Sequence, residues 1–311
     1  MGDLLSVGQS AIRAYSHALS VTSDNIANSQ TTGYVRRSAK LAEAPAASEL
    51  PLYRNSLSSG GVTVEGVTRK IEQWLVEDAR SASSTAEQAK ALATWLSSAE
   101  NSLADDEDGI GDSISKLFDM ADALSADVTD TTRRNEFLSA VQQVVDRISG
   151  AATQMSSIKD GIQSQATQSV ETIERSLNAL KEINFSLQRS KAGSANSAAL
   201  LDERDRLLNE ISNHVAIEAE VGYNGTITVR TAGPGGVTLL DNNGAADISM
   251  TTAADGSLSF SSTQNGTTSA FTPAGGSLAG LSTASRIITT RQGQLDDLAT
   301  DFAALINDIA H

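Results

Sequence analysis

The densest group of potential metal ligands in this sequence is an acidic run, Asp105-Asp106-Glu107-Asp108, which is followed by Gly109. Carboxylates ahead of a glycine are typical of calcium-binding loops. If Gly109 were the invariant glycine of such a loop, Ser115 would occupy the twelfth position, where a bidentate glutamate is required, and Ala104 the first. The spacing does not fit a calcium loop. We therefore expect an acidic connection whose carboxylates favour the start of the following helix.

Two further groups of residues bear on catalysis. The three histidines, His17, His214 and His311, fall on separate expected elements, and none has a nucleophile nearby at a spacing typical of an enzyme family. The run 202–206 alternates carboxylates with arginines, which is more typical of solvated ion pairs on a helix, each worth tenths of a kcal/mol. Paired carboxylates of the glycosidase kind stay open, because any acidic protein offers many pairs. We expect no enzyme, and no catalytic, cofactor-binding or metal-binding residues.

Composition narrows the classes of protein further. The chain has 311 residues and a net charge of -15, so it lacks the basic surface that binding to nucleic acid requires. It has no cysteine, which excludes disulfides and thiolate metal sites. No apolar run approaches the roughly 20 residues that span a bilayer. The first residues carry Asp3 instead of a basic segment, so we expect no cleaved signal peptide and, for an exported protein, another route.

The first segment, residues 1–35, is expected to form an amphipathic helix, a stop and a sharp turn. Its apolar residues recur at spacings of three and four, on one face of a helix: Leu4, Ala11, Ile12, Tyr15, Ala18, Leu19 and Ile26. An isolated helix of roughly 27 residues is marginal in water, so this helix needs a partner. Four bulky members of the stripe form the predicted pairing face: Leu4, Ile12, Leu19 and Ile26.

The middle of the chain changes period twice. Residues 36–70 lose the helical period and are expected to form an extended β arm. Residues 71–214 return to apolar steps of three and four and form a helical rod, in which one helix covers residues 132 to 189 and spans about 85 Å. Residues 215–275 alternate with a period of two, and Asn224-Gly225 supplies a hairpin turn, so they form a small β-domain.

Residues 276–311 resume heptads and are expected to return to the rod as a helix. The sequence therefore predicts a mainly α fold with a small β-domain, built as an elongated rod of long antiparallel helices. The final pattern is still running at His311, with no glycine or proline stop signal. We expect that the chain has been truncated, or that a partner completes this helix.

One short motif carries a resemblance. The pattern Ser-x-Asn-Ile-Ala-Asn followed by Thr-x-Gly-Tyr resembles the N-terminal motif of flagellar rod, hook and hook-associated proteins. Here it comprises Ser23, Asn25, Ile26, Ala27, Asn28, Thr32, Gly33 and Tyr34. The resemblance implies that the N-terminal helix pairs with a C-terminal helix to line an axial tube, and that the chain is exported unfolded by the flagellar type III apparatus.

A wider resemblance covers nearly the whole chain. It rests on the helical body before residue 190, the Leu-Leu-Asp-Glu-Arg-Asp-x-Leu-Leu segment at 200–208, and the patterns that begin at Gly276, Gly293 and Phe302. These features resemble those of the hook-associated family whose members join the hook to the filament. Rod and hook proteins share the N-terminal motif but have β-rich bodies, and members of the junction family carry a further C-terminal region.

The resemblance implies a structural role in motility and flagellum assembly, outside the cell, as a homo-oligomeric ring between hook and filament. The implied partners are further copies of the chain, the hook protein, a second junction protein, flagellin-type axial proteins and the export apparatus. An export chaperone would bind only if the further C-terminal region is present. Neither nucleic acid nor membrane insertion is expected. Three alternatives stay open: another axial protein of the hook or distal rod, an extracellular binding module, and a cell-wall hydrolase.

Overall fold

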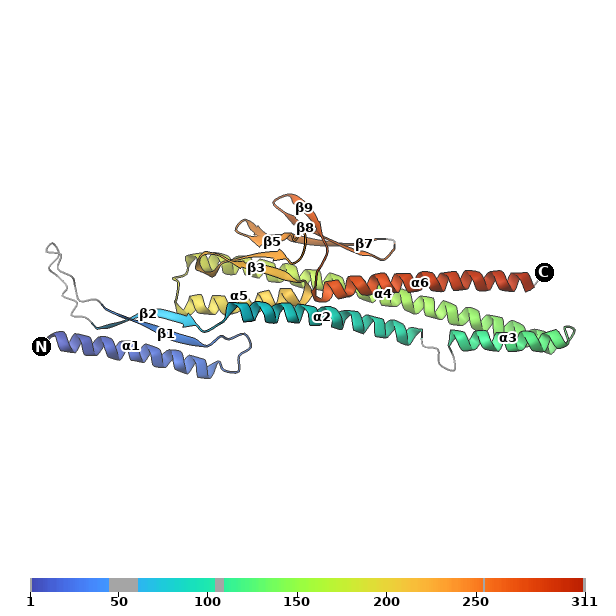
Figure 1. The fold of residues 1–311 in the computed structure, drawn as a ribbon, viewed down its shortest axis with the longest axis horizontal. Helices are drawn as coiled ribbons and strands as arrows, with labels where there is room; N and C mark the ends of the chain where they lie inside the picture. The colour runs from blue at the N-terminus through green and yellow to red at the C-terminus, as the bar shows by residue number, and fades with distance from the viewer. Residues whose placement is uncertain (1, 45–60, 104–108, 254, 310–311) are drawn as a thin grey trace.

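The computed structural model describes residues 2–44, 61–103, 109–253 and 255–309 (Figure 1). The acidic run 105–108 and His311 lie outside the described residues. The described part is mainly helical, with short antiparallel sheets grouped ahead of the final helix, which confirms the predicted fold class. Figure 1 shows an elongated body with α1 (Gly2–Ala27) near one end and α3 (Ile110–Ala126) at the other.

The central element is α4 (Thr131–Arg189), along which α2 (Gln73–Ser102), α5 (Ala195–His214) and α6 (Gly276–Ile309) pack. Asp130 caps the start of α4, where its carboxylate accepts a 2.8 Å hydrogen bond from the N–H of Thr132. The bulky members of its inner stripe are each 0% exposed: Met155, Ile162, Ile173, Leu177, Leu180 and Leu187. This helix coincides with the one predicted over residues 132 to 189, and its buried stripe forms the centre of the rod.

A second, smaller core lies at the α3 end of the rod. There α3 folds back against the first turns of α4, and α6 runs alongside them (Figure 1). The three helices bury a common set of side chains: Leu117, Phe137, Val144, Ile148, Leu295 and Phe302. Because the residues of α4 and α6 in this set recur at steps of four and seven, each of these two helices presents one apolar stripe to this core.

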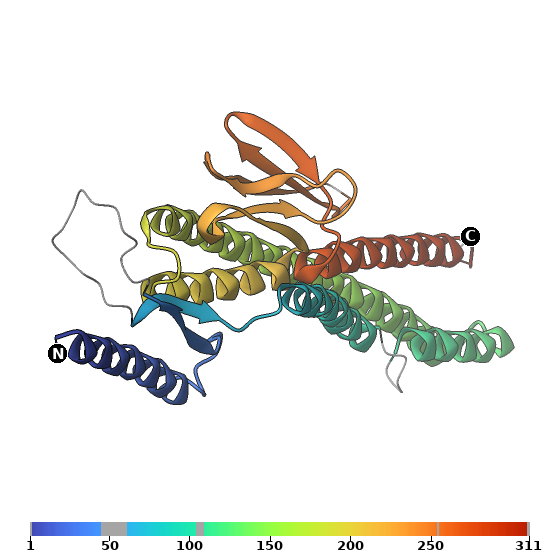
Figure 2. The same cartoon turned by 60° about the vertical axis from the view of Figure 1, so that its left-hand side comes forward.

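The β-domain stands on one side of the rod (Figure 2). Four strands form one antiparallel sheet: β3 (Ile217–Val221), β4 (Ile227–Thr231), β5 (Thr238–Asp241) and β6 (Gly244–Ala245). Three form a second: β7 (Asp247–Thr252), β8 (Leu258–Gln264) and β9 (Thr267–Phe271). Asn224 and Gly225 have φ values of 54° and 81° between β3 and β4, so the predicted hairpin turn is confirmed.

The β arm is a two-stranded hairpin between α1 and the rod (Figure 2). It pairs β1 (Arg37–Glu43) with β2 (Val62–Arg69), with a bulge between Lys40 and Leu41. The outer edge of β2 meets the rod, where the N–H of Val67 donates a 2.6 Å hydrogen bond to the carbonyl of Gly193. Gly66 permits this approach, because a Cβ there would lie 2.5 Å from the same carbonyl oxygen.

Candidate assembly surface and the joint that holds it

The bulky apolar residues of α1 face solvent. Leu4 is 82% exposed, Ile12 69%, Leu19 68% and Ile26 71%, and Leu5 and Tyr15 extend the same stripe. Contiguous apolar surface of this kind on a folded protein marks a site of interaction more often than an accident of packing. The four residues of the predicted pairing face therefore form one open surface, and its pairing with another helix stays a prediction.

The opposite side of α1 packs on the β arm. Ala14 is 1% exposed and Val21 6%, and the Ser10 hydroxyl accepts a 3.2 Å hydrogen bond from the N–H of Val62. At about 100° per residue, these small side chains lie on a face roughly 140° from the bulky stripe. The helix does have a partner within the chain, as its length required. Its packed face is one that the sequence pattern did not single out.

Asn25, in the motif, joins the end of α1 to the start of β1. Its Oδ1 accepts hydrogen bonds from the N–H of Arg37 (2.8 Å) and the hydroxyl of Tyr34 (3.0 Å), and its Nδ2 donates to the carbonyl of Arg37 (2.8 Å). Gly33 supplies the turn between them with φ of 83°. One side chain thus satisfies both backbone groups of a strand residue and fixes where the arm leaves the helix.

The other motif residues divide by position. Asn28 Nδ2 donates to the carbonyl of Asp24 (3.0 Å), and its Oδ1 accepts from the Thr31 hydroxyl (3.3 Å), so Asn28 stabilises the helix end locally. Ser23, Ile26, Ala27 and Thr32 are exposed. The motif therefore combines a half-buried clamp, centred on Asn25, with an open surface.

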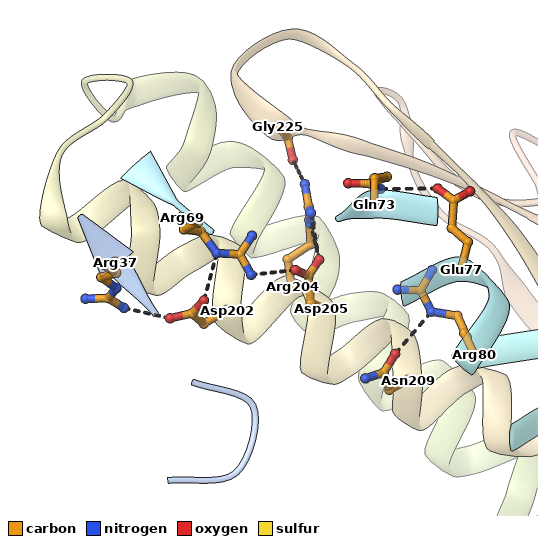
Figure 3. Close-up of polar contacts among 10 residues, drawn as sticks. All are labelled: Arg37, Arg69, Gln73, Glu77, Arg80, Asp202, Arg204, Asp205, Asn209 and Gly225. Carbon is orange, nitrogen blue, oxygen red and sulfur yellow. Dashed lines mark hydrogen bonds and ion pairs between the residues drawn. The ribbon is translucent and has the colours of Figure 1, made fainter. Parts of the chain in front are cut away.

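A network of charged side chains fastens the arm to α5 (Figure 3). Asp202 accepts from Arg37 Nη2 (2.6 Å) and Arg69 Nε (2.8 Å), and Asp205 accepts from Arg69 Nη2 and Arg204 Nη2 (2.6 Å each). Arg204 Nη1 continues to the carbonyl of Gly225 in the β-domain (2.7 Å). These side chains are only 4 to 13% exposed, so their pairing is shielded from water. Arm, rod and β-domain meet in one polar joint.

The network overturns one prediction. Asp202, Arg204 and Asp205 were expected to be solvated ion pairs within their helix, and that prediction is wrong, because the partners of both carboxylates include arginines of the distant β arm. The prediction of a solvated ion pair holds for Glu203 and Arg206, whose side chains are 46% and 47% exposed. The hydrogen bond from Arg206 lowers the pKa of the Glu203 carboxyl.

The joint becomes recognisable in the sequence once the register of the β hairpin is known. Arg37 and Arg69 stand directly opposite each other in the β hairpin, and two adjacent guanidinium groups need carboxylates. Asp202 and Asp205 lie three residues apart, on one face of a helix. Figure 3 also shows Arg80 of α2 beside this face, donating to Asn209 (3.1 Å), and burial lowers the pKa of its guanidinium.

The structure places one histidine beside a hydroxyl that sequence spacing did not predict. His214 Nδ1 lies 3.1 Å from Ser277 Oγ, which is also 3.3 Å from Ser169 Oγ. Both serines are buried where α4, α5 and α6 meet, and burial lowers the pKa of His214. These contacts hold helices together. Among the described residues, no group of three or more His, Cys, Asp or Glu side chains could hold a metal ion.

No helix in the described part of the chain is long and apolar enough to cross a membrane.

The fold and the site together define an elongated structural subunit. It has a long helical body, a protruding helix with its bulky side chains in solvent, and a polar joint between the two. Residues 96–311 match the family described as the flagellar hook-associated protein FlgK helical domain. The chain belongs to this hook-associated family. Residues 5–34 also match the flagella basal body rod protein family.

Individual relatives agree with this assignment. The chain is 24% identical over 250 residues to flagellar hook-associated protein 1 of Salmonella typhimurium, and 22% identical over 244 residues to that of Bacillus subtilis. Those alignments cover 80% and 77% of this chain but 44% and 48% of the relatives. The chain therefore spans less than half the length of these curated relatives.

A solved structure shows the same fold. The flagellar hook junction protein FlgK from Burkholderia pseudomallei matches with a TM-score of 0.59 and 21% sequence identity, over 67% of this chain and 38% of that chain. The family assignment agrees with the resemblance that the N-terminal motif indicated.

Proposed function

We propose that this chain serves at the junction between flagellar hook and filament, as a subunit of a ring of like copies. The helical rod packs side by side with its neighbours, and the β-domain faces away from the axis. Long helices suit this role because their parallel seams bury area against neighbours and resist bending. The names of the relatives support this role, and the open apolar stripe of α1 is the single observation that carries it.

In this proposal α1 lies toward the axis and pairs through Leu4, Ile12, Leu19 and Ile26 with an apolar helix of another region or subunit. The polar joint fixes the angle between α1 and the rod, since Asn25 sets the base of the arm and Asp202 holds the arm to α5. The remaining partners are the hook protein, a second junction protein and flagellin-type proteins. Export takes place through the flagellar type III apparatus.

The test replaces Ile12 and Leu19 by Asp in the full-length protein, in a strain that lacks its own copy of the gene. Charges in the pairing face should abolish incorporation into isolated hook-filament structures, and motility with it, because burying a carboxylate in an apolar seam is costly. A matched control replaces Gln9 and Ser20 by Asp, since both are exposed and lie outside the stripe. Normal incorporation of the Ile12/Leu19 variant, with secretion and helicity preserved in both proteins, would contradict the proposal.

A further inference from the structure

The outer edge of β9 is an open strand edge at the tip of the β-domain. Four of its five residues are exposed, and the β8–β9 hairpin projects from the side of the molecule opposite α1 (Figures 1 and 2). The hairpin closes through Asn265 and Gly266, with φ values of 51° and 78°. In such a two-residue turn the backbones of the two flanking residues, Gln264 and Thr267, form hydrogen bonds with each other. Along the ladder from this pair, hydrogen-bonded and non-hydrogen-bonded residue pairs then alternate.

This register decides which backbone groups of β9 point outward. Thr267, Ser269 and Phe271 bond to β8, whereas Thr268 and Ala270 direct their N–H and C=O groups away from the sheet. Among the described residues, no backbone hydrogen bond outside the sheet reaches Thr268 or Ala270. At the far end of β9, Ala270 and Phe271 line a hollow of about 450 Å³ together with Pro234 and Gly235 of the β4–β5 loop.

Four of the other strand edges in the described part of the chain are protected. Exposed strand edges are normally blunted by charges, bulges or a covering element, because they pair with other chains. The edge of β1 carries Lys40, Glu43 and a bulge, and the edge of β3 carries Glu218 and Glu220. Two further edges are covered: β2 donates to the carbonyl of Gly193, and the N–H of Ile248 in β7 donates to Glu174 (2.9 Å). β9 has neither charge nor bulge.

The charge of the chain indicates what pairs with this edge. Two copies at -15 each repel, so they approach most readily through an uncharged surface. From Gly256 through Ser285 the sequence contains no Asp, Glu, Lys or Arg. The edge is also self-complementary, because two antiparallel β9 strands centred on Ser269 place Thr268 opposite the partner's Ala270. That register joins the outward groups in four hydrogen bonds.

We propose that β9 pairs with β9 of a second copy of this chain, forming a continuous sheet of six strands across a two-fold axis at Ser269. Such an isologous contact closes on two copies, so it differs from the propagating contacts of a ring, and its failure would leave the proposed function standing. Five residues per copy bury much less than the roughly 800 Å² per partner of stable complexes, so the pairing is weak.

The first experiment is sedimentation of the full chain up to about 1 mM, a concentration at which weak pairs become populated. All proteins carry Ile12→Asp and Leu19→Asp, which removes association through the stripe of α1. The mean mass should rise toward that of a pair. Ser269→Lys and Ser269→Glu should each weaken association roughly tenfold, because like charges then lie directly opposite across the two-fold axis. An equal mixture of the two should restore it.

A matched control keeps the measurement specific. Thr251→Lys adds the same charge at an exposed position of β7, away from the edge, and should associate like the parent protein. A second probe uses the absence of cysteine, since Ser269→Cys should form a disulfide-linked pair on mild oxidation and Thr251→Cys should not. A parent protein that stays monomeric, a Ser269→Lys variant that associates normally, or a Ser269→Cys variant that does not crosslink overturns the proposal.

Discussion

The helices α1 and α4 carry the same kind of sequence pattern and bury it in opposite ways. In α4 the bulky stripe is sealed, with Ile173 and Leu177 both 0% exposed. In α1 the bulky stripe is open, with Leu19 68% exposed, and the small residues Ala14 and Val21 are packed instead. Periodicity identifies a face that is able to bury apolar surface. It does not identify the face that the fold covers.

The difference follows from what each helix meets. α4 is surrounded by α2, α5, α6 and strands of the β-domain, so side chains from several elements fill the space around its stripe. α1 meets a hairpin of two strands, and its small face allows close approach to it. The stability of α4 should therefore depend on its bulky side chains, and that of α1 on the polar joint.

Truncating equivalent leucines in the two helices should give the largest contrast. Leu177→Ala should lower the free energy of unfolding by about 3 kcal/mol, because it leaves a cavity in a fully packed core. Leu19→Ala removes an exposed side chain and should change the same quantity by less than about 0.5 kcal/mol. Urea unfolding of both variants measures the two values. Similar losses would show that the stripe of α1 is packed in solution.

Disrupting the polar joint should cause the second-largest loss in the free energy of unfolding. Asp205→Ala leaves Arg69 and Arg204 largely buried without this carboxylate, and should lower the free energy of unfolding by about 2 kcal/mol. Glu203→Ala removes an exposed pair two residues away, and should cost less than about 0.5 kcal/mol. Hydrogen exchange should also quicken in β2 and α5 of the Asp205 variant only. Equal effects of the two substitutions would contradict the claim that the joint stabilises the fold.

The smallest expected effect is at the clamp of the motif. Asn25→Ala removes three hydrogen bonds at the base of the arm, and about 1 kcal/mol of local stability should be lost there. Amide exchange near Arg37 should then quicken roughly fivefold, with α4 unchanged. Asn28→Ala is the control, since its side chain bonds only to Asp24 and Thr31 of its own turn. Faster exchange at Arg37 in the control variant would argue against a specific clamp.

Most of the fold could be predicted from local signals. The cap at Asp130, the long stripe of α4 and the turn residues Asn224 and Gly225 act through neighbours in the sequence, and each element formed where its pattern indicated. The candidate site was predicted less completely. The open stripe of α1 was found by its period, but Asp202 and Asp205 were assigned to solvent because alternating charges on a helix are more typical of solvated ion pairs.

The sequence by itself determined the elements, their order and the family, because helix period, strand period and turn chemistry are properties of short stretches of chain. Only the tertiary structure decided which face of α1 is covered and which charges are shielded from water. Arg37 and Asp202 are 165 residues apart in sequence and 2.6 Å apart in space. Burial and pairing depend on such distances across the fold, and no local pattern encodes them.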